Sequence, residues 1–330
     1  MKKVYILSLL ALTLIISTRG QEKTEEPEFK PSGSPFAKIY TNAHTQVSES
    51  KNETAFEITR AYFGYEYEFS EYFSAKINLD VGNPESGKLQ HTAFLKNAYM
   101  KFSYNNLTTC FGMISTIQFK LQEKIWGHRY ILKSLQDEYK FGSSADLGVS
   151  VAYKLHDMVS IDAIFMNGEG YKSVQSDSTY RAGAGITIKP VKGLLLRGYF
   201  DYEKKDEPLM NIATFIGYSK DAISAGVELN IENNNKYEKD HNLTGYSAYA
   251  SYQIKKKFQV FGRYDYLTSN KLSGETDLWN ISKNGQLFMA GLEYSPVKGI
   301  KLAPNYKGWL PSTDGSSLIS WIYLNAEIRF

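Results

Sequence analysis

Residues 317–330 alternate in a way that predicts one β-strand and the environment of its two faces. Counted back from the last residue, every second position is apolar or small, with Ser320 as the exception: Phe330, Ile328, Ala326, Leu324, Ile322 and Leu318. The positions between them are polar or amphipathic: Arg329, Glu327, Asn325, Tyr323 and Trp321. Because successive side chains of a strand point to opposite sides, the pattern predicts one face toward lipid and one toward water.

The same period continues upstream in segments of about nine to thirteen residues, the length that a tilted strand needs to cross a bilayer. In residues 72–82, for example, Ile77 and Leu79 alternate with Asn78 and Asp80. Sixteen such segments follow one another, at 36–47, 54–69, 72–82, 92–104, 107–114, 143–155, 158–167, 179–189, 193–203, 210–218, 222–232, 243–254, 258–267, 286–295, 299–307 and 317–330. The pattern predicts an all-β fold, a transmembrane up-and-down antiparallel β-barrel of about 16 strands.

A soluble β-sandwich would give the same alternation with its apolar face turned inward, so the connections decide between the two. Every second connection is tight, as at Ser70 and Glu71 or Asn105 and Asn106. The others are longer and polar, at 48–53, 83–91, 115–142, 168–178, 204–209, 233–242, 268–285 and 308–316. Short turns at one rim and long loops at the other are typical of an outer-membrane barrel.

The two ends of the chain predict export and insertion. Residues 1–20 carry Lys2 and Lys3, then an apolar run and small residues, and are interpreted as a signal peptide rather than a buried helix. Residues 21–35 are polar and rich in Pro and Gly, which predicts a disordered periplasmic leader before a barrel at 36–330. The final Phe330 resembles the C-terminal signal by which bacterial outer-membrane barrels are recognised, so we expect the barrel-assembly machinery as a partner and strand 317–330 to pair with 36–47.

Composition excludes several classes of protein. No further apolar stretch is long enough for a spanning helix, so a helical membrane protein is excluded. Aromatic residues are 14% of the chain, with 25 Tyr, which suits an interface between lipid and water. Cys110 has no partner for a disulfide, and a net charge of +3 gives no sign of a nucleic-acid partner. The five His are scattered singly, so we expect no metal site, no catalytic residues and no cofactor.

A short repeat marks two of the tight turns. Lys189, Pro190, Val191, Lys192 and Gly193 recur as Ser295, Pro296, Val297, Lys298 and Gly299. Pro presets one turn dihedral angle and Gly relaxes another, so reuse of a good hairpin turn and an ancient duplication both explain the repeat.

Several short motifs resemble porins related to the phosphate-selective porin O and P family. They are the stretches from Cys110 to Met113, from Asp146 to Val149 and from Met166 to Gly170, and Gly291 to Tyr294 with Pro296. The resemblance spans most of the chain after residue 20. It implies a sixteen-stranded passive channel in a Gram-negative outer membrane, often a homotrimer. It does not carry over phosphate selectivity, because that selectivity depends on a ladder of basic residues that is not matched here.

The inward faces of the predicted strands carry equal numbers of basic and acidic residues. The candidates for basic pore lining are Arg60, Lys76, Arg181, Arg197, Arg263 and Arg329. Opposite charges stand two residues apart on one face, as in Arg263 with Asp265 and Arg329 with Glu327. Local pairing is therefore the favoured interpretation, and charges on this face indicate a wet lumen.

Residues 115–142 form the longest connection and are unusually apolar for a solvated rim. In porins the corresponding third loop folds into the barrel, and we expect the same here, with a cap on the rim or a contact with a neighbouring subunit as the alternatives. The predicted constriction residues are Lys120, Lys124, Arg129 and Lys133.

The sequence therefore predicts an outer-membrane porin, a passive channel for small hydrophilic solutes with a modest preference for anions. The alternatives are a substrate-specific transporter, for phosphate or oligosaccharide, and a barrel-borne hydrolase.

Overall fold

Sixteen antiparallel strands form one closed barrel. The computed structural model describes residues 29–47, 53–82 and 91–330, and the barrel occupies Pro31–Phe330. The strands are β1 (Ser32–Val47), β2 (Thr54–Glu68), β3 (Phe73–Gly82), β4 (Thr92–Tyr104), β5 (Leu107–Ser115), β6 (Ala145–His156), β7 (Val159–Met166), β8 (Arg181–Ile188), β9 (Leu194–Lys204), β10 (Pro208–Lys220), β11 (Ile223–Asn233), β12 (Leu243–Lys255), β13 (Phe258–Ser269), β14 (Gly285–Tyr294), β15 (Ile300–Pro311) and β16 (Ile319–Arg329). The predicted fold class is confirmed.

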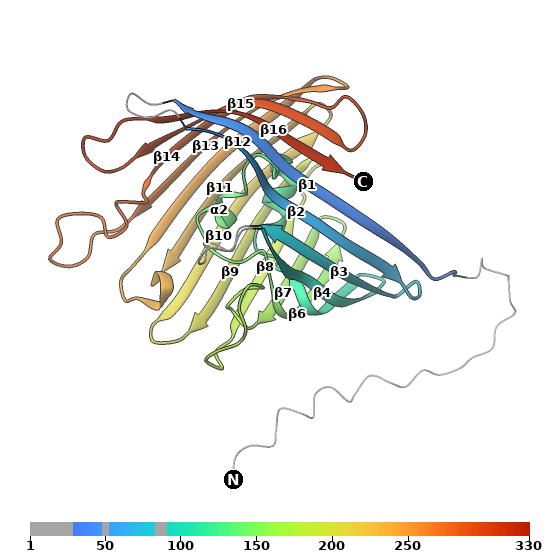
Figure 1. Cartoon of the computed structure of the whole chain (residues 1–330). Coiled ribbons are helices and arrows are strands. Elements are labelled where there is room, and N and C mark those ends of the chain that lie inside the picture. The colour runs from blue at the N-terminus through green and yellow to red at the C-terminus, as the bar shows by residue number, and fades with distance from the viewer. Residues whose placement is uncertain (1–28, 48–52, 83–90) are drawn as a thin grey trace, which may run out of the picture. The chain divides into compact units, whose positions relative to one another are not determined.

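Each strand pairs with its neighbours in the chain, and β1 closes the ring against β16 (Figure 1). The register of this seam runs from Lys38 opposite Arg329 to Val47 opposite Ser320, as the expected pairing of the first and last strands requires. Along this seam closure removes the sheet edge, so its backbone N–H and C=O groups do not face lipid without a partner.

The predicted leader was wrong at its end, because β1 begins at Ser32 and not after residue 35. Ser32 lies opposite Glu68, and Pro35 lies opposite Tyr65. Backbone bonds between β1 and the end of the chain start at Ala37, opposite Phe330, so residues 32–36 are bonded on one side alone and Pro35 tolerates its missing N–H there. The predicted signal peptide and residues 21–28 of the leader lie outside the described residues.

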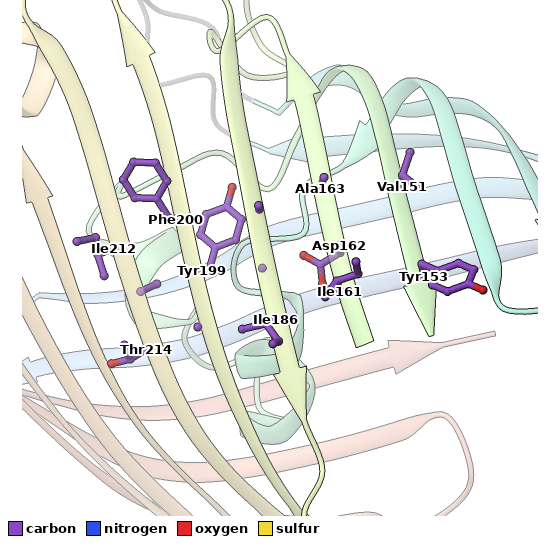
Figure 2. Close-up of a pocket in the computed structure, with 14 residues that line it drawn as sticks. Val151, Tyr153, Ile161, Asp162, Ala163, Ile186, Tyr199, Phe200, Ile212 and Thr214 are labelled. Atoms are coloured by element: carbon purple, nitrogen blue, oxygen red, sulfur yellow. The ribbon is translucent and has the colours of Figure 1, made fainter. Parts of the chain in front are cut away.

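The two faces of the wall follow the predicted alternation. On β8, Arg181 and Thr187 are buried inside, while Ile186 is exposed outside. Figure 2 shows part of the outer face, a groove of about 610 Å³ where Ala163, Ala184 and Gly198 leave room between larger side chains. The outer face is thus apolar and the inner face polar, as a wall between lipid and water requires.

Short connections gather at one rim, named here the short-turn rim: 69–72, 105–106, 157–158, 189–193, 221–222, 256–257 and 295–299. The opposite, long-loop rim has the longer ones. The connection between β9 and β10 is the exception there, since only residues 205–207 remain outside the strands instead of the predicted 204–209.

Helices are few and short. The β5–β6 loop, residues 116–144, contains α1 (Lys120–Trp126) and α2 (Leu135–Glu138), and the connection between β11 and β12 contains η2 (Asn235–Tyr237). None of the helices in the described ranges is long and apolar enough to span a membrane.

A candidate pore constriction

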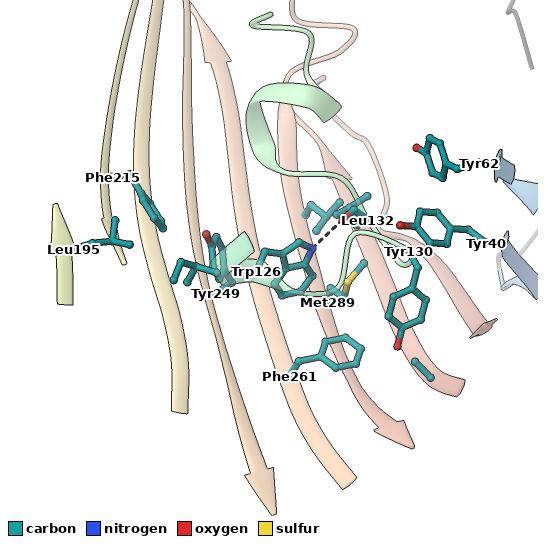
Figure 3. Close-up of a cluster of buried hydrophobic side chains, with 13 residues drawn as sticks. Tyr40, Tyr62, Trp126, Tyr130, Leu132, Leu195, Phe215, Tyr249, Phe261 and Met289 are labelled. Atoms are coloured by element: carbon teal, nitrogen blue, oxygen red, sulfur yellow. Dashed lines mark hydrogen bonds between the residues drawn. The ribbon is translucent and has the colours of Figure 1, made fainter. Parts of the chain in front are cut away.

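The β5–β6 loop crosses the lumen and packs on the far wall. Ser224 Oγ of β11 donates to Ile125 O at 2.8 Å, and Tyr249 Oη of β12 donates to Gln122 O at 3.0 Å. Trp126 is 1% exposed and lies against Tyr249 and Phe261 (Figure 3). The largest apolar cluster of the barrel therefore lies between this loop and the wall.

Local sequence explains the shape of the loop. Gly127 ends α1 in the left-handed region at φ 72°, where its N–H donates to Glu123 O. The chain then turns back so that the Trp126 indole N–H donates to Leu132 O at 2.8 Å. These bonds hold Trp126 in its pocket on the wall.

Three of the predicted lining arginines fasten the loop to the wall. Arg197 donates to Ile117 O at 2.9 Å, Arg181 donates to Phe141 O at 3.2 Å, and Arg263 donates to Lys133 O at 2.6 Å. Each also pairs with a carboxylate of the wall, namely Asp162, Asp201 and Asp265 respectively. These guanidinium groups are buried, so they bind backbone carbonyl groups of the loop and do not face the open lumen.

The other three predicted lining residues lie in different surroundings. Arg60 pairs with Asp80 at 3.3 Å, and Lys76 pairs with Glu66 at 2.6 Å. Arg329 is exposed at the end of β16. Local pairing on one strand thus holds for Arg263 and Asp265, whereas among the ion pairs of the described residues none joins Arg329 to Glu327.

Two cavities lie between the loop and the wall and share Arg60, Arg129 and Lys133. One, of about 480 Å³, also reaches Tyr40, Glu57 and Tyr130. The other, of about 410 Å³, is lined in addition by residues of the β7–β8 loop, including Glu169, and by Arg181. Because both cavities share these three basic residues, we name this region the basic passage.

The structure brings together only two of the four predicted constriction residues. Arg129 and Lys133 line the basic passage. Lys120 and Lys124 are exposed, and Lys124 lines a separate cavity of about 560 Å³ beside the turn 189–193. Lysines four residues apart share one face of α1, and the opposite face carries the buried Ile125 and Trp126.

Most charges of the basic passage are paired. Arg129 binds Glu123 and Asp137, each at 3.1 Å. Lys133 lies 3.9 Å from Glu138. The two cavities are lined by six basic residues, Arg60, Arg129, Lys133, Lys140, Lys172 and Arg181, against four acidic ones, Glu57, Asp137, Glu138 and Glu169.

A second inward loop was missed by sequence reasoning. It is the β7–β8 loop, residues 167–180, whose Tyr171 Oη donates to Asp80 at 2.8 Å. Gly168 N and Gly170 N donate to Asp146 Oδ2 at 2.8 and 3.1 Å, and both glycines have positive φ. The sequence signal for this turn was the pair Gly168 and Gly170 directly after β7, since glycine tolerates the positive φ of a tight turn around a carboxylate.

Glu293 of β14 contacts two residues of the β5–β6 loop and one lysine of the wall. Tyr130 Oη donates to it at 2.9 Å, Lys301 Nζ lies at 3.0 Å and His128 Nε2 at 3.5 Å. Burial lowers the pKa of His128 below its ordinary value, although Glu293 opposes that shift. Burial also raises the pKa of Tyr130, so this hydroxyl stays protonated and acts as a donor.

The family model described as “Putative beta-barrel porin-2, OmpL-like” matches residues 143–330. This is a different family from the phosphate-selective porins that the short motifs resemble, so that resemblance is not confirmed. Among curated proteins, none matches the chain.

Three solved structures illustrate the shared fold. OmpF of Salmonella typhi, in complex with daunomycin, is 12% identical with a TM-score of 0.70, over 90% of this chain and 97% of that one. The outer-membrane channel DcaP of Acinetobacter baumannii is 14% identical with a TM-score of 0.63, over 91% and 97%. The trimer form of in-vitro folded OmpT of Vibrio cholerae is 12% identical with a TM-score of 0.61, over 91% and 99%.

Proposed function

We propose that the chain, which belongs to the OmpL-like beta-barrel porin-2 family, lies in the bacterial outer membrane. There it is a passive channel for small hydrophilic solutes with a modest preference for anions. Residues 1–20 serve as its cleaved signal peptide, and Phe330 is read by the barrel-assembly machinery. Outer-membrane lipid surrounds the wall. A homotrimer is proposed as the assembly, supported by the trimer form of a similar fold.

The observation that carries this proposal is the basic passage. Arg60 comes from the wall, whereas Arg129 and Lys133 come from the loop, so cations stand on both sides of one path. A solute that follows this path passes six basic and four acidic side chains. A small excess of one sign biases entry and does not forbid the other sign, and salt screens it further.

Reversal potentials of the purified protein in a planar bilayer with asymmetric salt test the proposal. The test variant is Arg129→Gln with Lys133→Gln, and the matched control is Lys120→Gln with Lys124→Gln. Both remove two positive charges from the same loop. We expect the anion-to-cation permeability ratio to fall roughly two- to threefold in the test variant alone, given two charges a few ångströms from the path in screened water.

The outcomes separate the competing functions. Equal effects in the two variants would place the path elsewhere, and the absence of any step conductance would remove the channel function. Current that saturates with one phosphate compound or oligosaccharide, and is blocked by it, would favour a substrate-specific transporter.

A further inference from the structure

The short-turn rim carries an arc of lysines along half of its circumference. Four turns and the strand ends beside them contribute the lysines, and backbone hydrogen bonds join each turn to the next hairpin: Ser219 N to Gly193 O, Gln253 N to Ala222 O, and Ser295 N to Lys257 O. We name this surface the basic arc, and its members are Lys189, Lys192, Lys220, Lys255, Lys256, Lys257 and Lys298. All seven are exposed, and Asp221 is the acidic residue among them.

The charge of the basic arc is confined to this part of the barrel. The three remaining turns of the rim, 69–72, 105–106 and 157–158, contain Glu71 and Asp157 but no Lys or Arg. At the opposite rim, loops 205–207, 234–242 and 270–284 hold five Lys against six Asp or Glu. Within the described residues, no ion pair of 4.0 Å or less neutralises a lysine of the arc.

Exposed apolar side chains stand directly beside these lysines. The repeated Pro-Val-Lys-Gly sequence places Val191 next to Lys192 and Val297 next to Lys298, with the valines 61% and 59% exposed. The following Gly193 and Gly299 have φ 92° and 89°, a conformation that closes each turn and favours glycine. Ile254, beside Lys255, is 51% exposed.

We propose that the basic arc binds the anionic headgroups of phospholipids in the leaflet that meets the short-turn rim. Lysine stems reach along apolar surface while the ammonium groups stay with phosphate, and Val297 and Ile254 enter the boundary between headgroups and acyl chains, whereas Val191 lines the cavity that also contains Lys124. A hydrated polyanion would be recognised by the lysines alone and gives no role to Val297 and Ile254. The outward apolar face ends at these turns, which places them at headgroup level.

Native mass spectrometry of the full chain in neutral detergent tests this. The protein is offered equal amounts of phosphatidylglycerol and phosphatidylcholine with identical acyl chains. The test variant replaces Lys192, Lys255, Lys257 and Lys298 by Gln. The matched control replaces four exposed lysines of the long-loop rim by Gln: Lys236, Lys239, Lys271 and Lys283. Heat-modifiable migration on gels verifies that each variant is folded.

We expect wild type and control to retain phosphatidylglycerol preferentially, and the test variant to lose about tenfold of that preference at low salt, since each lysine near an anionic surface adds measurably to binding. Unchanged preference in the test variant, or an equal loss in the control, would overturn the proposal. So would binding to isolated peptidoglycan sacculi that depends on the arc while lipid preference does not.

Discussion

At the residue scale, Arg263 shows how charge and backbone are satisfied together in the lumen. Its guanidinium is paired with Asp265 at 2.7 Å, donates to Lys133 O and lies over Trp126. Arg263, Asp265 and Trp126 are buried, so the arginine cannot be removed without leaving a buried carboxylate and a loop carbonyl with fewer partners.

We therefore predict that Arg263→Met costs about 3–5 kcal/mol in the free energy of unfolding, the range for breaking a buried pair from one side. Arg263→Met with Asp265→Leu should recover most of that loss, because the Asp265 carboxylate no longer remains without its partner. Urea unfolding of the folded barrel measures both. The control is Lys154→Met, whose pair with Asp157 is exposed and should not change the midpoint. Similar losses in all three variants would contradict this account of Arg263.

His128 gives the loop a dependence on pH. Burial lowers its pKa, so the undocked loop binds a proton more readily than the docked loop does. Docking is thus fully stable above the ordinary His pKa of about 6.5 and weakens as the pH falls below it. The groups that face the ring are Glu293, Lys301, Gln259, Trp126, Tyr130 and Phe261.

The measurement is the frequency of brief openings in single-channel records between about pH 7.5 and 5.5, a range that brackets the ordinary His pKa. We predict a severalfold increase on acidification in wild type. His128→Phe keeps an aromatic ring against Phe261 and should abolish the increase. An increase that persists in His128→Phe would assign the effect to another group.

Residues could be assigned to the two faces from the sequence, but their partners could not. Arg181, Arg197 and Arg263 lie on the inner face, a position that the period of two decides locally. Their acceptors are carbonyl groups of the β5–β6 loop, 40, 80 and 130 residues away. Such contacts depend on how the loop folds back, which no local pattern encodes.

At the element scale, the β5–β6 loop takes no part in the strand pairing of the wall, so we expect the wall to form without it. All sixteen strand pairings are made without it. We predict that replacing residues 119–136 by a short Gly/Ser linker raises single-channel conductance severalfold and admits larger sugars. Liposome swelling with sugars of increasing size measures the second effect.

The matching control replaces residues 272–278 of the long-loop rim by the same linker. This segment belongs to the connection between β13 and β14 and lines none of the cavities described here. Unchanged conductance after removal of 119–136 would show that solutes do not pass along the basic passage.

Strands were predictable as elements, whereas one inward loop was not. Long alternating segments leave little freedom, and each observed strand overlaps one predicted segment. The β7–β8 loop was missed because it is mostly polar and the contact that anchors it, from Tyr171 to Asp80, joins residues 91 positions apart. The early start of β1 was missed because Gly33 and Pro35 predicted an irregular segment, whereas these residues pair with β2 in the structure.

At the scale of the whole molecule, closure depends on a seam between the two ends of the barrel. Phe330 N donates to Ala37 O at 3.2 Å and Ala37 N donates to Phe330 O at 2.8 Å, so the last residue completes this ladder. We predict that deletion of Phe330 lowers the amount of heat-modifiable protein in the outer membrane, through recognition by the assembly machinery. Refolding of purified protein in detergent should be affected less, because the register from Lys38 onward remains. Wild-type amounts in the membrane after deletion would refute the proposed role.

The β5–β6 loop also constrains the order in which the molecule can be built. It follows β5 in the chain, yet Gln122, Lys133 and Tyr130 bind partners that come 127, 130 and 163 residues later. Contacts so distant form slowly, because a long segment must be ordered before they contribute. The loop therefore cannot seat before β12, β13 and β14 have assembled. If the wall closes before the loop seats, the barrel passes through a state in which the loop does not narrow its lumen, and a newly made copy would pass larger solutes until seating is complete.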